Sequence, residues 1–153
     1  MQRQELGDFS SIVCFKAAIT GMEEALGEKA TAIALTTAGR ARGKKLANEM
    51  GLASQTLPLD VLASKLAYAL GKDGTRLCII EKILEEGDAI RAYTSETLCS
   101  AYEPQGSSRR CTFTLGAVWG VLEAVFGKRF QGKHVESVLQ GGSHDVFEFT
   151  VLG

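Results

Sequence analysis

The segment Arg109–Phe130, "RRCTFTLGAVWGVLEAVFGKRF", decides which fold we expect for this chain. Its large apolar residues recur at helical spacing. They form one stripe, made of Leu115, Val118, Trp119, Leu122, Val125 and Phe126. Gly116 and Gly120 lie inside this helix, although each glycine costs a helix interior about 1 kcal/mol relative to alanine. The segment therefore predicts an amphipathic helix whose glycines need an explanation.

The two glycines have two competing explanations. Gly116 and Gly120 are four residues apart, so both lie on one side of the helix. In one interpretation the missing side chains let another helix or strand approach closely. In the other, the exposed backbone forms one wall of a ligand groove. A second pair, Gly39 and Gly43, has the same spacing in "AGRARGKKLA", so we expect two tightly packed helices that are candidates to pack on each other.

The residues before this segment predict three more helices and a hairpin. The first helix runs from about Asp8 to Leu26 and the second from about Thr31 to Met50. A short strand competes with the helix at the β-branched start of the second, "TAIALTT". The third helix begins at Pro58 and has leucines at helical spacing. Two β-rich runs around "EEGD", in "TRLCIIEKILEEGDAIRAYTSE", then predict a β-hairpin.

The end of the chain predicts a second hairpin. "KHVESVLQ" and "VFEFTVLG" flank the turn "GGSHD", and Phe147, Phe149 and Val151 alternate with polar residues. One face of the last strand is therefore expected to be buried. The predicted fold is α+β, with helices packed on one face of a four-stranded antiparallel sheet, in the order ααα-ββ-α-ββ. Because no linker or repeat divides residues 1–153, we expect a single domain.

The composition limits the class of protein. The chain has 153 residues, 45% hydrophobic and 23% charged, with a net charge of −1. Such values are ordinary for a soluble globular protein, and without a basic excess we expect no nucleic-acid partner. We find no signal-like start and no apolar stretch long enough for a transmembrane segment. A cytoplasmic location is therefore the default expectation.

The cysteines are expected to be free thiols. Cys14, Cys78, Cys99 and Cys111 form no CxxC pair, and a reducing compartment keeps such thiols unpaired. Cys111 lies at the start of the glycine-containing helix, where the helix dipole and the neighbouring arginines favour a thiolate. It is therefore either a reactive or ligand-contacting cysteine, or a buried thiol that begins the apolar stripe.

No metal or cofactor site is predicted. His134, Glu136, His144 and Asp145 are of metal-binding types, but only His134 and Glu136 have clear same-face spacing along a strand. The chain has no GxGxxG after a strand. Cofactor-dependent chemistry therefore has no support in the sequence.

From Cys99 to its end the chain resembles the 4-vinyl reductase domain family, which is distantly similar in fold to small subunits of the transport protein particle (TRAPP) tethering complex. The resemblance rests on "CTFTLGAVWG" and "VESVLQGGSHDVFEF". The last hairpin of the family has the pattern Glu-x-x-Cys-x-x-x-Gly-x-x-x-Cys-x-Phe. Glu136 and Phe149 match it, whereas Leu139, Ser143 and Phe147 replace its cysteines and glycine. The resemblance implies an α+β domain, usually dimeric, with a cavity between helices and sheet that binds hydrophobic molecules.

The sequence and the family resemblance leave three candidate functions. The first is a non-enzymatic binding module for a hydrophobic small molecule: an acyl chain, an aromatic compound or a tetrapyrrole. The residues expected at this site are Cys111, Leu115, Gly116, Trp119, Gly120, Phe147 and Phe149. The second is a structural or assembly subunit that acts through a homodimer or partner interface on the glycine helix, in a photosynthetic complex or pigment metabolism. The third, an enzyme of pigment metabolism, lacks a cofactor fingerprint.

Overall fold

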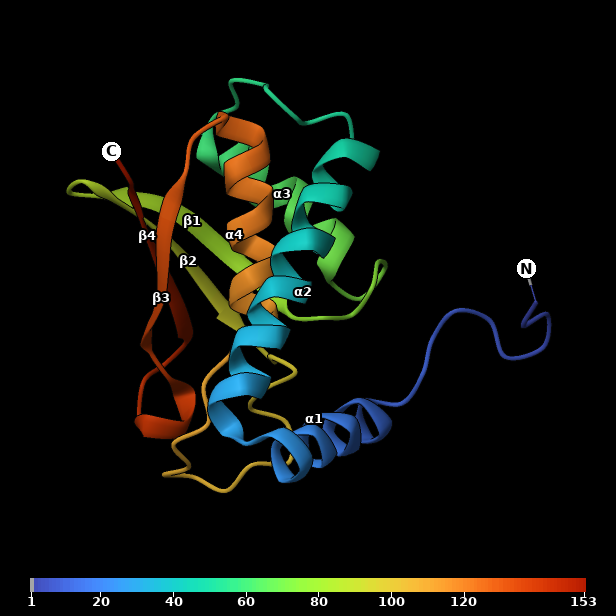
Figure 1. Cartoon of the computed structure of the whole chain (residues 1–153). Helices are drawn as coiled ribbons and strands as arrows, with labels where there is room; N and C mark the ends of the chain where they lie inside the picture. The colour runs from blue at the N-terminus through green and yellow to red at the C-terminus, as the bar shows by residue number, and fades with distance from the viewer. Residues whose placement is uncertain (1) are drawn as a thin grey trace.

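A computed structural model describes residues 2–153. Over these residues four helices and four strands follow the predicted order (Figure 1). The helices are α1 (Ile12–Leu26), α2 (Glu28–Glu49), α3 (Leu59–Leu70) and α4 (Phe113–Phe126). The strands are β1 (Ile79–Glu86), β2 (Ala89–Ser95), β3 (Phe130–Glu136) and β4 (Asp145–Val151), with a short 3₁₀ helix, η1 (Val138–Gln140), between the last two. The predicted α+β fold class is confirmed.

The two predicted hairpins combine into one antiparallel sheet. Its strand order is β1-β2-β4-β3, so pairing of β2 with β4 joins the hairpins at the centre. Phe147 and Phe149 of β4 are fully buried, as the alternation predicted. Val151 is 54% exposed, because it is the last residue of the strand and pairs only with Phe130 at the start of β3.

The helices lie on one face of the sheet in Figure 1. Helix α3 packs on β1, and α4 packs on β3 and also against α2, which in turn contacts α1. The core between these layers is apolar. Its largest fully buried side chains include Phe130, Phe147, Phe149, Leu62, Leu66, Leu70, Ile83 and Leu122.

The glycines of α2 and α4 face each other. A Cβ atom on Gly39 would lie 3.0 Å from the Cα of Gly116, and one on Gly120 would overlap the carbonyl oxygen of Arg40. Gly43 in turn faces the backbone of α4 at Ala117. The close-packing interpretation is the one that the structure shows, and the two glycine pairs do pack on each other.

Helix α4 is not amphipathic, contrary to our prediction. Four residues of the predicted stripe are buried, and Trp119 and Phe126 are partly buried. The opposite side is also buried, through Gly116, Ala117, Gly120 and Val121. The helix is enclosed because α2 covers the face that the sheet leaves free, and a helix covered on both faces is apolar nearly all round.

Two helix boundaries differ from the prediction for local reasons. Helix α1 begins at Ile12 rather than Asp8, because the hydroxyl of Ser11 accepts a hydrogen bond from the Val13 amide (3.1 Å) and caps the helix there. Helix α2 begins directly after Gly27, so "TAIALTT" is helical and the competing strand is excluded. In the second hairpin, β3 ends at Glu136 and the following residues turn into η1.

Candidate functional site

The aromatic residues predicted to line a ligand site are packed into the core. The indole N–H of Trp119 donates to the carbonyl of Phe130 (3.0 Å). Its ring lies edge-on to Phe149, with centroids 6.3 Å apart, and the guanidinium of Arg40 covers it at 4.3 Å. Leu115 and Phe147 are buried in the same core. The space between α4 and β4 is therefore occupied by protein side chains at these positions.

Gly116 and Gly120 do not form a ligand groove. The backbone of α2 occupies the space beside both residues. Their role is helix packing, which sequence spacing alone left open.

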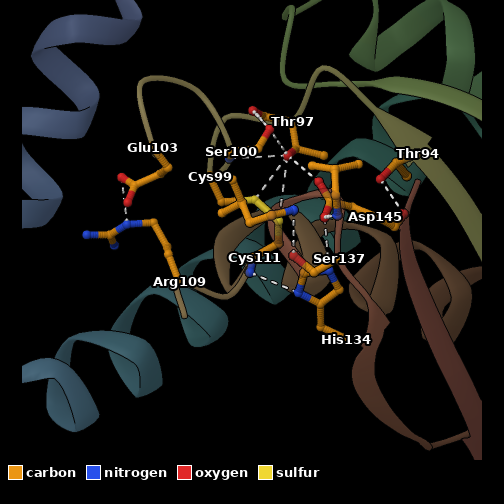
Figure 2. Close-up of a disulfide and its surroundings, with 12 residues drawn as sticks. Thr94, Thr97, Cys99, Ser100, Glu103, Arg109, Cys111, His134, Ser137 and Asp145 are labelled. Carbon is orange, nitrogen blue, oxygen red and sulfur yellow. Dashed lines mark hydrogen bonds and ion pairs between the residues drawn. A yellow bond between two sulfur atoms is a disulfide. The ribbon is translucent and has the colours of Figure 1, made fainter. Parts of the chain in front are cut away.

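Two of the four cysteines are paired, contrary to the prediction that all are free thiols. Cys99 and Cys111 form a disulfide with a Cα–Cα distance of 5.2 Å (Figure 2), while Cys14 and Cys78 are free. The free-thiol prediction was therefore wrong for two of the four cysteines. Their separation of 12 residues is no recognisable motif, and only the return of the loop between β2 and α4 brings them together.

A polar cluster surrounds the disulfide. The hydroxyl of Thr97 lies 3.2 Å from Cys99 Sγ and 3.7 Å from Cys111 Sγ, and it donates to Asp145 Oδ2 (2.7 Å). His134 contacts the other oxygen of Asp145 (3.1 Å) and accepts from the Cys111 amide (3.3 Å). The Val138 amide also donates to Asp145 (3.2 Å). Figure 2 shows these side chains converging from separate elements.

The charge of Asp145 is stabilised by this cluster. Burial raises the pKa of the Asp145 carboxyl, but hydrogen bonds from His134, Thr97 and the Val138 amide lower it by more, so the net pKa is below its usual value. Thr97 was not a sequence candidate, because nothing local marks it as a partner of Asp145.

The cluster also contains potential metal ligands. One atom each of Cys99, Cys111 and Asp145 lie within 4.8 Å of one another. The disulfide engages both sulfurs, so neither is a thiolate ligand in this state. The residue pair with strand spacing, His134 and Glu136, is separated by a register shift in β3, and Glu136 instead accepts from the Ser143 amide (3.0 Å).

Ion pairs connect the disulfide loop, residues 100–110, to α1. Lys16 of α1 is only 7% exposed, and its Nζ lies 2.7 Å from Glu103 Oε2 and 2.8 Å from the Cys99 carbonyl. Arg109 holds both carboxylate oxygens of Glu23, at 2.9 and 3.2 Å. Its Nε also lies 2.9 Å from Glu103, as an ion pair whose angle is too poor for a hydrogen bond. These ion pairs therefore attach the loop to α1.

A cavity of about 270 Å³ lies between α1, the start of α2 and this loop. We call it the α1 cavity. Its lining is mixed, with charged and hydroxyl groups beside a few apolar side chains, and it includes the disulfide residue Cys99. The apolar members are Ile19, Ala32, Leu35, Leu98 and Phe113.

A larger recess, of about 700 Å³, opens on the other side of Leu98 and Phe113, which line both spaces. We call it the apolar groove. It lies between the start of α1 and the segment that follows α3. Its apolar lining residues are Phe9, Ile12, Phe15, Leu70, Leu77, Leu98 and Phe113. Arg42 and Arg76 supply positive charge to the lining. Asp8 supplies one negative charge, and the free Cys14 also lines the groove.

The fold is that of known solved structures. The chain is similar to the phenol-responsive sensory domain of the transcription activator PoxR with phenol (TM-score 0.60, 12% identity, covering 94% of this chain and 76% of that one). It is also similar to trafficking protein particle complex subunit 3 from Naegleria fowleri covalently bound to palmitic acid (0.62, 13%, 93% and 93%). A third similar structure is a vinyl-4-reductase family protein from Methanocaldococcus jannaschii (0.53, 17%, 97% and 86%).

These similarities confirm the fold that the sequence resemblance implied. At 12–17% identity they define a fold and no more. No protein-family model and no curated protein matches the chain. Among the helices of residues 2–153, none combines the length and the apolar character that crossing a membrane requires.

Proposed function

We propose that this chain is a binding module for a hydrophobic small molecule that lies in the apolar groove. The observation that carries this proposal is the groove itself. Seven apolar side chains line a recess of about 700 Å³, and small-molecule sites are typically apolar recesses of about 300–1,000 Å³. The proposed site is at the α1 side of the molecule rather than between α4 and the sheet.

The charges of the groove favour an acidic ligand. Arg42 and Arg76 outnumber the single carboxylate of Asp8 in the lining. Arg42 pairs with a half-exposed Glu49 (3.4 Å), and Arg76 lies over the ring of Phe9 at 4.9 Å. A guanidinium group suits a carboxylate because it can donate two parallel hydrogen bonds. We therefore propose an acyl chain or an aromatic compound that carries an acidic group.

The similar structures support this class of ligand without identifying it. One was solved with phenol and another with covalently bound palmitic acid. Both ligands combine an apolar body with a polar end, which matches the lining of the groove.

Titration with a fluorescent fatty acid, 11-(dansylamino)undecanoic acid, tests the proposal. Phe15 lines the groove, and Phe15→Glu should raise Kd at least about tenfold, because it removes apolar contact and repels the carboxylate. Ala18→Glu is the matched control, since Ala18 is an exposed position of the same helix and is not part of the lining. Saturable binding with an equal Kd in both variants would exclude this site. The absence of saturation by any of a panel of acyl and aromatic acids would reject the function.

A second candidate function is assembly through the surface of α1 and α2. Four large apolar side chains on these helices or just before α1 are more than half exposed: Phe9, Val13, Leu26 and Ile33. We propose that these side chains contact a second copy of the chain, which would form a homodimer through α1 and α2 instead of the buried glycine helix. Light scattering of Val13→Glu/Ile33→Glu should then give a monomer where the native chain gives a dimer. A monomeric native chain would rule out the dimer.

A further inference from the structure

We infer that the Cys99–Cys111 disulfide controls ligand binding in the apolar groove according to the redox state of its surroundings. The inference rests on the proposed function for its readout, but it also predicts a change in the free protein. Cytoplasmic disulfides are usually transient and redox-responsive, so a cytoplasmic location and a disulfide at this position are compatible.

The first step is that the disulfide orders the loop that holds α1. It closes residues 100–110 into a ring, which carries both Glu103 and Arg109. These two side chains make the ion pairs with Lys16 and Glu23 of α1. Because α1 otherwise packs mainly on α2, this loop is its second attachment.

The second step is that the cysteines position the groove wall. Leu98 directly precedes Cys99, and Phe113 follows Cys111 by two residues. Both residues separate the groove from the α1 cavity, and the ring of Phe15 packs edge-on against Phe113 at 5.6 Å. The disulfide therefore connects the two segments from which this wall is built.

The third step is the chemistry of reduction. We expect a thiol reductant to attack Cys99 rather than Cys111, because Cys99 lines the α1 cavity and is 8% exposed, whereas Cys111 is 2% exposed and does not line it. The reductant thiolate attacks Cys99 Sγ, the S–S bond breaks, and Cys111 leaves as a thiolate that takes up a proton. A second reductant thiol attacks the mixed disulfide and releases Cys99. Two electrons and two protons are transferred, giving two protein thiols and one oxidised reductant.

Reduction removes the cross-link that limits the conformations of the loop. We expect the loop to loosen, α1 to lose part of its attachment and the groove wall to lose its fixed spacing. Because a pre-formed site binds more tightly than one that must be ordered, Kd for the dansyl fatty acid should rise about tenfold on reduction. By reciprocity, bound probe should make the disulfide harder to reduce by the same factor.

The test compares Kd for this probe before and after treatment with a phosphine reductant. The native chain should lose affinity, whereas Cys99→Ser/Cys111→Ser should bind like the reduced chain and be unaffected by reductant. If the double variant does not fold, the reduced native chain, checked by circular dichroism, supplies the same comparison. An unchanged Kd, with reduction of the disulfide verified by mass, overturns the inference.

A readout without ligand separates this inference from the proposed function. Trypsin should cleave after Arg109 and Arg110 faster in the reduced chain, and amide exchange over residues 100–110 should accelerate. If the oxidised chain binds no probe, the proposed function fails while these rates still test the loop. If cleavage and exchange are equal in both states, or if Cys99 and Cys111 react with iodoacetamide in the denatured chain without reductant, the redox control is rejected.

Discussion

Gly39 of α2 and Gly116 of α4 lie face to face where the two helices cross. A Cβ on Gly39 would be 3.0 Å from the Cα of Gly116, and a Cβ on Gly116 would be 3.1 Å from the Cα of Gly39. The same two Cβ atoms would overlap the backbone carbonyl oxygens of Phe113 and Thr36, at distances that real Cβ atoms essentially never show. The intrinsic cost of glycine in both helices is therefore offset by an approach that no other residue permits.

Gly116→Ala should reduce the free energy of unfolding by about 3 kcal/mol, because the added methyl group displaces the backbone of α2. Gly21→Ala is the control: Gly21 is also inside a helix, but a Cβ there meets nothing within 4 Å. The control should stabilise the protein by about 0.5–1 kcal/mol. Urea unfolding measures both, and equal effects of the two substitutions would contradict the packing role.

Lys16→Ala should cost about 2–3 kcal/mol, because it leaves a mostly buried carboxylate, Glu103, with one cation fewer. The loss should appear first as faster amide exchange in α1, since that helix has few other contacts. Lys29→Ala, at an exposed position of α2, serves as the control and should change neither quantity. Unchanged exchange in α1 of Lys16→Ala would show that the loop does not hold the helix.

Glu123 should make stability sensitive to acid. Burial raises the pKa of its carboxyl, but hydrogen bonds from Arg40 and the Phe130 amide, with the charges of Arg40 and Lys44, lower the net pKa below 4.5. A lowered folded-state pKa stabilises above the ordinary value, and this contribution is lost as pH falls through the lowered pKa. Glu123→Gln should therefore cost about 1–2 kcal/mol near pH 7.

The difference between Glu123→Gln and the native chain should shrink once the pH is below 4.5, where Glu123 becomes protonated during unfolding. Urea unfolding across this pH range measures it, with the exposed Glu24→Gln as control. A difference that stays constant on acidification would mean that the charge of Glu123 contributes nothing.

Thiol labelling should divide the four cysteines into three classes. Burial raises the pKa of the Cys78 thiol to about 12, and the charge of Asp145 adds to the effect, so Cys78 should not react near neutral pH. Iodoacetamide should label the exposed Cys14 in the folded chain, Cys78 as well after denaturation, and Cys99 and Cys111 only after reduction. Mass spectrometry of the peptides follows each step, and labelling of Cys111 in the unreduced chain would contradict the pairing.

The single tryptophan reports where ligand binds. Trp119 is six residues after Phe113, about 9 Å further along α4. A saturated fatty acid in the groove should displace the dansyl probe without shifting the wavelength of Trp119 emission. A blue shift of that emission during displacement would instead place the ligand beside Trp119, Phe147 and Phe149.

The order of helices and strands could be predicted from the sequence, because helical and strand periodicity depend on residues close together in the chain. The alternation around Phe147 and Phe149 and the two glycine pairs are patterns of this kind. Even so, the predicted amphipathic character of α4 was wrong. Its second buried face consists mainly of small residues. A search for large apolar residues at helical spacing does not detect such a face, because glycine and alanine add little to the hydrophobic pattern.

The candidate site depended on contacts between distant segments. The Cys99–Cys111 bond, the Lys16–Glu103 ion pair and the wall shared by Leu98 and Phe113 each follow from how a loop returns to the helices. The spacing of residues along the chain does not predict the path of this loop, because that path depends on how α1, α2 and α4 pack together. Periodicity thus specified the elements and their order, whereas long-range packing determined which thiols pair and where an apolar recess remains open.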